Sequence, residues 1–165
     1  MEPRIDYRHV SPDGIRPIFE LGRYLASSGL EPSLQELVKL RASMINGCAF
    51  CIDMHTKDAR AAGETEQRLY GLSAWRETPY YSDRERAALA WTEAVTLVAD
   101  DQVPDEVFEE ARSQFDETEL VNLTLAVIAI NSWNRLAISF RTVPGSYEPR
   151  MAASAGAARG AAGTA

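Results

Sequence analysis

The sequence predicts an all-α fold. No stretch alternates apolar and polar residues over four or more positions between turn signals, whereas helix start and stop signals recur along the chain. The chain has 165 residues, 45% of them hydrophobic, which is enough for one domain with a sizeable core and too little for two. We therefore expect one helical domain over residues 1–150.

Two helices are expected before the first cysteine. The first lies over residues 16–26, where apolar side chains recur at helical spacing. Ser33 and Glu36 have the spacing of a capping box, in which each side chain satisfies a backbone amide of the other. The second helix is therefore expected to start near Leu34.

The second helix is expected to stop at Asn46 and Gly47. Both residue types tolerate the left-handed conformation that ends many helices. A third helix then begins at Cys48 and runs to Gly63, so that the two helices form a hairpin.

The middle of the chain carries three further helix starts. A short helix is expected over residues 65–72, and Ser82 with Glu85 forms a second capping box. Pro104 is placed for the first turn of the next helix, followed by two acidic residues. The helix after Ser82 shows a buried stripe of four apolar positions: Ala87, Trp91, Ala94 and Val98.

The last and longest helix is expected to start at residues 118–119. From Leu120 to Phe140 apolar side chains occupy nearly every face, so this helix is either central or covered by a partner subunit. We expect a homo-oligomer. Residues 151–165 are almost entirely Ala, Gly, Ser and Thr, and we expect this tail to be disordered.

Charge and hydropathy exclude several classes of partner. Seventeen Lys and Arg against 24 Asp and Glu give a formal net charge of −7, the wrong sign for binding nucleic acid or an anionic membrane. The N-terminal residues lack a basic stretch followed by an apolar segment, and the apolar run 120–130 is short of the ~18 residues that span a bilayer. We expect a cytoplasmic protein.

The chemistry is expected at Cys48 and Cys51, the only two cysteines. A close cysteine pair in a reducing compartment is more often redox-active or metal-binding than structural. At a helix N-terminus, the unpaired backbone amides favour the thiolate. The spacing also puts both sulfur atoms on one helix face, close enough for a disulfide after modest rearrangement.

His55 and Glu36 are the expected proton-handling neighbours. His55 lies four residues after Cys51, on the same helix face, and imidazole exchanges protons readily near neutral pH. Glu36 would lie ~18 Å from Cys48 on one unbroken helix. Its role therefore depends on the hairpin, which would bring the two helices to within ~8–10 Å of each other.

These residues form the pattern E-x11-C-x-x-C-x3-H, which resembles the core of the alkylhydroperoxidase AhpD-like branch of the carboxymuconolactone decarboxylase family. The flanking residues 37–47 and 52–57, and residues 131–137 near the end of the last helix, are also similar to that branch. The resemblance covers roughly residues 5–145.

The resemblance implies an all-helical, oligomeric thiol peroxidase or disulfide reductase that acts in antioxidant defence. Cys51 would attack the hydroperoxide, and Cys48 would serve as proton donor and close the disulfide. Glu36 and His55 would form the proton relay. The family reductant is a dithiol such as a lipoylated or thioredoxin-like protein, and no metal or haem cofactor is required.

Two observations keep alternatives open. Phe50 stands where the best-known alkylhydroperoxidases of this type have a histidine. Three consequences are open: a low peroxidase rate, an oxidised substrate other than a hydroperoxide, or proton transfer by His55 alone. The helix dipole favours Cys48 as the thiol with the lower pKa, whereas the resemblance names Cys51 as the attacking thiol.

Three simpler interpretations compete with the redox one. Cys48, Cys51, His55 and Glu36 are formally sufficient for a zinc site. The chain could also be a non-catalytic oligomeric module, or the cysteines could be small buried side chains. Four polar or aromatic residues of the last helix are expected to serve packing and buried hydrogen bonding: Asn131, Trp133, Asn134 and Arg135.

Overall fold

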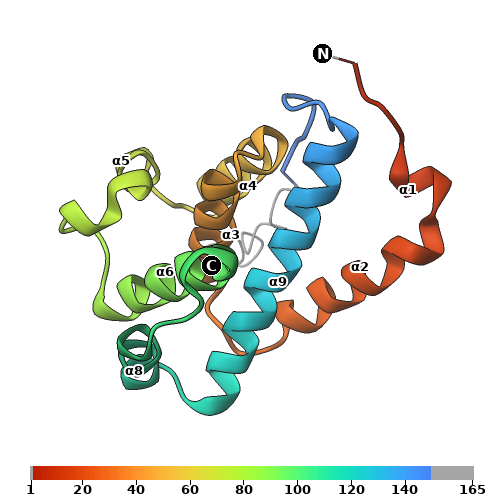
Figure 1. The fold of residues 1–165 in the computed structure, drawn as a ribbon. Helices are drawn as coiled ribbons and strands as arrows, with labels where there is room; N and C mark the ends of the chain where they lie inside the picture. Colours follow the sequence, from red (N-terminus) through yellow and green to blue (C-terminus); the bar gives the residue numbers. More distant parts are fainter. Residues whose placement is uncertain (1, 150–165) are drawn as a thin grey trace, which may run out of the picture.

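The computed structural model describes residues 2–149, and the predicted disordered tail lies outside this range. Within it the chain forms helices and no strand (Figure 1), so the all-α prediction is confirmed. The elements are α1 (Tyr7–Val10), α2 (Pro12–Ala26), α3 (Pro32–Asn46), α4 (Ala49–Ala61), α5 (Glu66–Gly71), the 3-10 helix η1 (Leu72–Glu77), α6 (Asp83–Thr96), α7 (Val98–Asp101), α8 (Asp105–Gln114) and α9 (Glu117–Phe140).

Helix α3 is the centre of the domain. It packs against α4, α6 and α9, while α2 runs along α9 on the side away from α6 (Figure 1). The residues of α3 that face these neighbours are almost fully buried, among them Leu37, Val38 and Leu40. The arrangement sets α3 and α4 side by side, with α9 crossing both.

The capping box predicted at Ser33 is wrong. Helix α3 starts at Pro32, which suits the first helical position because it has no amide hydrogen to leave unpaired. Glu31 is the N-cap residue, and its side chain makes no capping hydrogen bond. Glu36 therefore lies inside the helix, where its carboxylate is free for other partners. The capping box of Ser82 with Glu85 is confirmed, and a similar one joins Asp116 to Glu119.

Helix boundaries differ from the prediction in several further places. Helix α2 begins at Pro12, four residues early, and the short helices α1 and α7 were not predicted. The predicted stripe after Ser82 fails at Val98, which is 51% exposed, because α6 ends at Thr96 and the chain turns into α7. Pro104 caps α8 from outside instead of lying in its first turn.

Helix α9 is longer than its apolar run suggested. Its 24 residues, with a mean hydropathy of 1.3 over the most apolar stretch, would by length and composition suffice to cross a membrane. In the structure α9 packs against α2, α3 and α6, and Leu123, Val127 and Ile130 are buried between them. This packing is typical of a core helix of a helical domain.

The opposite face of α9 is also partly apolar, as predicted. Val121, Ile128 and Ile138 are between 45% and 60% exposed. That a second subunit covers them stays a prediction.

Candidate functional site

The turn between α3 and α4 sets the position of both cysteines. Gly47 has a φ of 69°, in the left-handed region where glycine is favoured, and it ends α3. The amide of Cys48 then donates to the carbonyl of Ser43 at 2.9 Å, which closes the turn. Cys48 is the cap residue of α4, and Cys51 lies in the first turn of the same helix.

Both thiols are free and buried, each 1% exposed. The pKa of Cys48 is lowered to about 7, chiefly because the Cys51 thiol donates a hydrogen bond to its sulfur, and the amides of Cys51 and Phe50 add to this effect. The same contact raises the pKa of Cys51, together with burial and the charge of Cys48. The contact therefore favours Cys48 over Cys51 as the site of the first negative charge of the pair, the direction that the helix dipole predicts.

Asn134 of α9 completes the surroundings of the thiols. Its side chain is fully buried, donates to the Ser43 hydroxyl at 3.0 Å and accepts from the Asn46 amide at 2.9 Å. It also lowers the pKa of both cysteines. The predicted role in buried hydrogen bonding is therefore correct but incomplete, because this asparagine also acts on the thiols.

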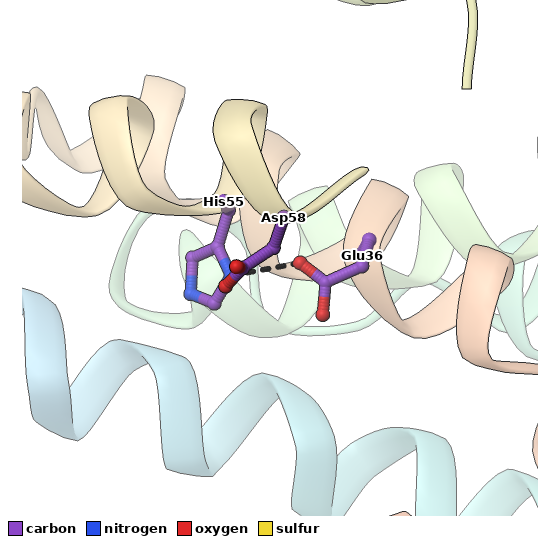
Figure 2. Close-up of side chains that lie close together, drawn as sticks. All are labelled: Glu36, His55 and Asp58. Atoms are coloured by element: carbon purple, nitrogen blue, oxygen red, sulfur yellow. Dashed lines mark hydrogen bonds and ion pairs between the residues drawn. The ribbon is translucent and has the colours of Figure 1, made fainter. Parts of the chain in front are cut away.

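The hairpin brings Glu36 and His55 together across α3 and α4. Nδ1 of His55 lies 2.9 Å from Oε2 of Glu36, the contact drawn as a dashed line in Figure 2. Lys39 donates to the other carboxylate oxygen at 2.8 Å. Burial opposes ionisation of Glu36, but the His55 hydrogen bond and the Lys39 charge outweigh it and lower its pKa to about 2.

The contact with an ionised Glu36 fixes how His55 carries its proton. A carboxylate can only accept, so the Nδ1 atom of neutral His55 must hold the hydrogen. Its Nε2 atom, on the side of the ring away from Glu36 in Figure 2, then carries the lone pair. A base oriented in this way by a carboxylate is suited to accept a proton from a thiol.

Asp58 joins this pair one helical turn after His55. Ligand atoms of Glu36, His55 and Asp58 lie within 4.8 Å of one another, so these three residues could hold a metal ion (Figure 2). Among the described residues neither cysteine belongs to such a group. The zinc set suggested by the sequence therefore does not converge on one point in this structure.

A cavity of about 410 Å³ opens beside the thiol pair. It lies between α2, α4 and α9, and Cys51 and His55 are both on its wall, whereas Cys48 is not among the described residues that line it. Its size is within the ~300–1,000 Å³ of many ligand sites. Phe50 is part of the wall, so the residue that replaces the family histidine forms an apolar surface beside Cys51.

Sequence reasoning found the two cysteines, His55 and Glu36, and the structure brings all four to the α3–α4 hairpin. It missed Lys39 and Asp58 as neighbours of the Glu36–His55 pair. The signal was weak, because Lys39 follows Glu36 by three residues and Asp58 follows His55 by three, spacings that are common on any helix.

Comparison with known proteins identifies the family of this chain. The profile of the carboxymuconolactone decarboxylase family matches residues 12–94. The uncharacterized protein YdfG of Bacillus subtilis is 45% identical over 139 residues, which cover 84% of this chain and 95% of YdfG.

Two solved structures extend the comparison. The first is ATU0492 of Agrobacterium tumefaciens, a protein of unknown function suggested to be the antioxidant defence protein AhpD. It is 46% identical, with a TM-score of 0.85 over 88% of this chain and all of its own. The debrominase Bmp8 shares the fold at 16% identity, with a TM-score of 0.75 over 84% of this chain and 74% of its own. The match to the family profile, together with YdfG and ATU0492 at more than 40% identity, places the chain in the AhpD-like branch of the carboxymuconolactone decarboxylase family.

Proposed function

We propose that this protein is a thiol-dependent peroxidase that reduces hydroperoxides through Cys51 and Cys48, with His55 and Glu36 as its proton relay. One observation carries the proposal. Cys51 and His55 line the same cavity, and the Nδ1 atom of His55 lies against the ionised Glu36 carboxylate. Cys48, whose pKa is lowered by its contact with Cys51, is placed to accept the Cys51 proton.

In the first step Cys51 attacks the terminal oxygen of the hydroperoxide. Its proton passes to the Cys48 thiolate or to Nε2 of His55 as the sulfur–oxygen bond forms. The oxygen–oxygen bond breaks, and the leaving alkoxide takes a proton from the same groups to become an alcohol. Cys51 is thereby oxidised to a sulfenic acid. This order reconciles the lower pKa of Cys48 with attack by Cys51, because Cys51 is the thiol on the cavity wall.

In the second step the Cys48 thiolate attacks the sulfur atom of the Cys51 sulfenic acid. Hydroxide leaves and is protonated to water, and the two sulfur atoms form a disulfide. An external dithiol, such as a lipoylated or thioredoxin-like protein, then reduces the disulfide and is itself oxidised. With a disulfide substrate in place of the peroxide, the Cys48–Cys51 dithiol would reduce that substrate to two thiols by exchange and itself become the disulfide, which is a disulfide reductase reaction.

The relatives support the coarser part of this proposal. Membership of the AhpD-like branch and the suggested antioxidant role of the Agrobacterium tumefaciens protein favour peroxidase-like chemistry. The fold alone does not select the substrate, since the debrominase Bmp8 has it too. A cytoplasmic location and a homo-oligomeric assembly remain predictions.

The test is a count of free thiols before and after one equivalent of cumene hydroperoxide, with dimedone present to trap sulfenic acid. Reduced wild-type protein is expected to lose two thiols. Cys48→Ser should lose one and accumulate a dimedone adduct at Cys51, because the resolving thiol is missing. Cys51→Ser should lose none. An adduct at Cys48 in Cys51→Ser protein would reverse the assigned roles.

A metal assay on the same samples tests the zinc alternative. A zinc module predicts one zinc per chain and thiols that resist both peroxide and alkylating reagent. Metal-free protein with reactive thiols would exclude it, and stoichiometric zinc with inert thiols would overturn the peroxidase.

A further inference from the structure

The wall of the cavity beside Cys51 is largely apolar. Phe19 of α2 and Trp133 of α9 pack against each other with their ring centroids 4.8 Å apart and their planes tilted by 59°. Ile18, Phe50 and Ile130 extend the same surface toward Cys51. Hydrogen peroxide is small and strongly hydrated, so it gains no binding free energy from an apolar wall. An alkyl chain or ring does, because its apolar surface is removed from water on contact with the wall.

Three cationic side chains also line this cavity: Arg8, Arg23 and Lys39. Two of them have carboxylate partners. Lys39 pairs with Glu36 at 2.8 Å, and Arg23 with Glu20 at 3.6 Å. These charges are therefore compensated within the protein.

Arg8 is different. Its guanidinium lies 5.8 Å from the centre of the Trp133 ring and 5.8 Å from that of Tyr7, and over residues 2–149 it forms no ion pair. The nearby Asp6 carboxylate instead accepts from the backbone amides of Arg8 and His9. The cavity therefore combines an apolar wall with one uncompensated positive charge.

The positive charge of Arg8 also acts on the Cys51 thiol. It partly opposes the rise in the pKa of Cys51 that Cys48 and burial cause. Arg8 and Phe50 also both line a second cavity, which lies between the N-terminal residues 3–8, Phe50 and residues 140–147. The Arg8 guanidinium is therefore placed near Phe50 at the edge of the Cys51 cavity. There it can bind an anionic group of a ligand whose apolar part lies against Phe19 and Trp133.

We propose that the Cys51 cavity binds apolar carboxylic acids, with the carboxylate on Arg8 and the alkyl chain on the wall of Phe19 and Trp133. The physiological oxidant would then be a hydroperoxide of a fatty acid type. This inference rests on the proposed function for the reaction, but the binding itself needs no reaction. An arginine held over an aromatic ring suits the role, since its planar fork offers two parallel donors to a carboxylate.

The first experiment measures binding of decanoate to the reduced full-length chain by calorimetry. Arg8→Gln is expected to weaken decanoate binding ~tenfold, since a hydrogen bond between charged groups is lost. Arg8→Lys should bind decanoate with an affinity between those of wild type and Arg8→Gln, because the charge remains but the two parallel donors are lost. Arg23→Gln is the matched control, on the same cavity but already paired with Glu20, and should stay within ~twofold of wild type. Decanol should bind wild type and Arg8→Gln equally.

Equal decanoate affinities for wild type and Arg8→Gln would overturn the inference, as would a preference for decanol over decanoate. The second experiment compares the rate of thiol loss with linoleic acid hydroperoxide and with its methyl ester. A preference for the acid that Arg8→Gln removes supports the inference. Thiol loss with cumene hydroperoxide but no preference for the acid would overturn the inference and leave the peroxidase intact. Decanoate binding through Arg8 without thiol loss by any hydroperoxide would overturn the peroxidase alone.

Discussion

Nδ1 of His55 and Oε2 of Glu36 lie 2.9 Å apart although 19 positions separate them in the chain. The hairpin at Gly47 makes this contact, because it turns α4 back along α3. The carboxylate fixes the tautomer of the imidazole, with the hydrogen on Nδ1 and the lone pair on Nε2. The left-handed conformation of Gly47 thus positions His55 against Glu36, and this contact orients the imidazole for the proposed proton transfer from the thiols.

Glu36→Gln is expected to slow thiol oxidation by cumene hydroperoxide ~tenfold to a hundredfold. The amide can present a donor to Nδ1 of His55, which would favour the tautomer that has no lone pair on Nε2 to accept the thiol proton. The rate would be measured by stopped-flow tryptophan fluorescence under excess peroxide.

Asp58→Asn is the matched control for Glu36→Gln. Its carboxylate also lies close to His55, but it accepts from the Tyr147 hydroxyl at 2.7 Å. This variant is expected to react within ~threefold of wild type. Equal losses in the two variants would show that negative charge near the imidazole matters and the specific Glu36 contact does not.

The lowered pKa of Glu36 predicts a pH-dependent contribution to stability. Its pKa in the folded protein is about 2, against an ordinary value of 4.5, so folding is favoured by the ionised form. The contribution, about 2 to 3 kcal/mol, is complete above the ordinary value and is lost as the pH falls through the range toward 2. Urea unfolding of wild type and Glu36→Gln should therefore converge at low pH. Parallel curves from pH 7 down to pH 3 would contradict the assignment.

The thiol pair is expected to titrate in two widely separated steps. One thiolate per chain should appear with a midpoint near pH 7, from Cys48, whereas Cys51 should stay protonated far above it. Thiolate absorbance in the ultraviolet measures both steps.

Single substitutions separate the two thiols. Cys51→Ala should raise the pKa of Cys48, because the hydrogen bond from the Cys51 thiol is lost. Cys48→Ala should lower the pKa of Cys51, since the neighbouring negative charge is gone. A midpoint near pH 7 that survives in Cys48→Ala would assign the thiolate to Cys51.

The sequence was sufficient to predict the all-α fold class, the α3–α4 hairpin and the placement of both cysteines at the start of one helix. Each of these features depends on local signals. A glycine in the left-handed region ends a helix whatever surrounds it, and a CxxC keeps both sulfur atoms on one face. The capping box at Ser33 failed because a second local signal, Pro32 at the helix start, competes for the same position. Nothing in the local sequence ranks these two signals.

Contacts across distant elements were beyond sequence reasoning. Arg8 meets Trp133 only because α1 folds back beside the end of α9, and nothing in either segment marks the contact. Asn134 was placed correctly in the buried interior, but its effect on the thiols arises from the crossing of α9 over the α3–α4 hairpin. Such roles depend on packing between helices far apart in the chain.

Asn134→Leu is expected to lower the free energy of unfolding by about 2 kcal/mol and to raise the pKa of Cys48. Leucine has the same branching with larger methyl groups in a fully buried position, and it leaves the buried Ser43 hydroxyl and the partly buried Asn46 amide each short of one partner. The loss of the amide donor near the sulfur atoms also destabilises the thiolate. Urea unfolding and the thiolate titration measure the two effects separately.

Ser132→Ala serves as the control for Asn134→Leu. Ser132 lies on the same helix and donates only to the carbonyl of Ile128, within α9. This variant is expected to change stability by less than ~0.5 kcal/mol and to leave the thiol titration unmoved. A shift of the Cys48 midpoint in Asn134→Leu without a stability loss would make Asn134 an electrostatic partner of the thiols alone. A stability loss with an unchanged midpoint would make it purely structural, and the hydrogen bonding between α9 and the hairpin would then be its whole function.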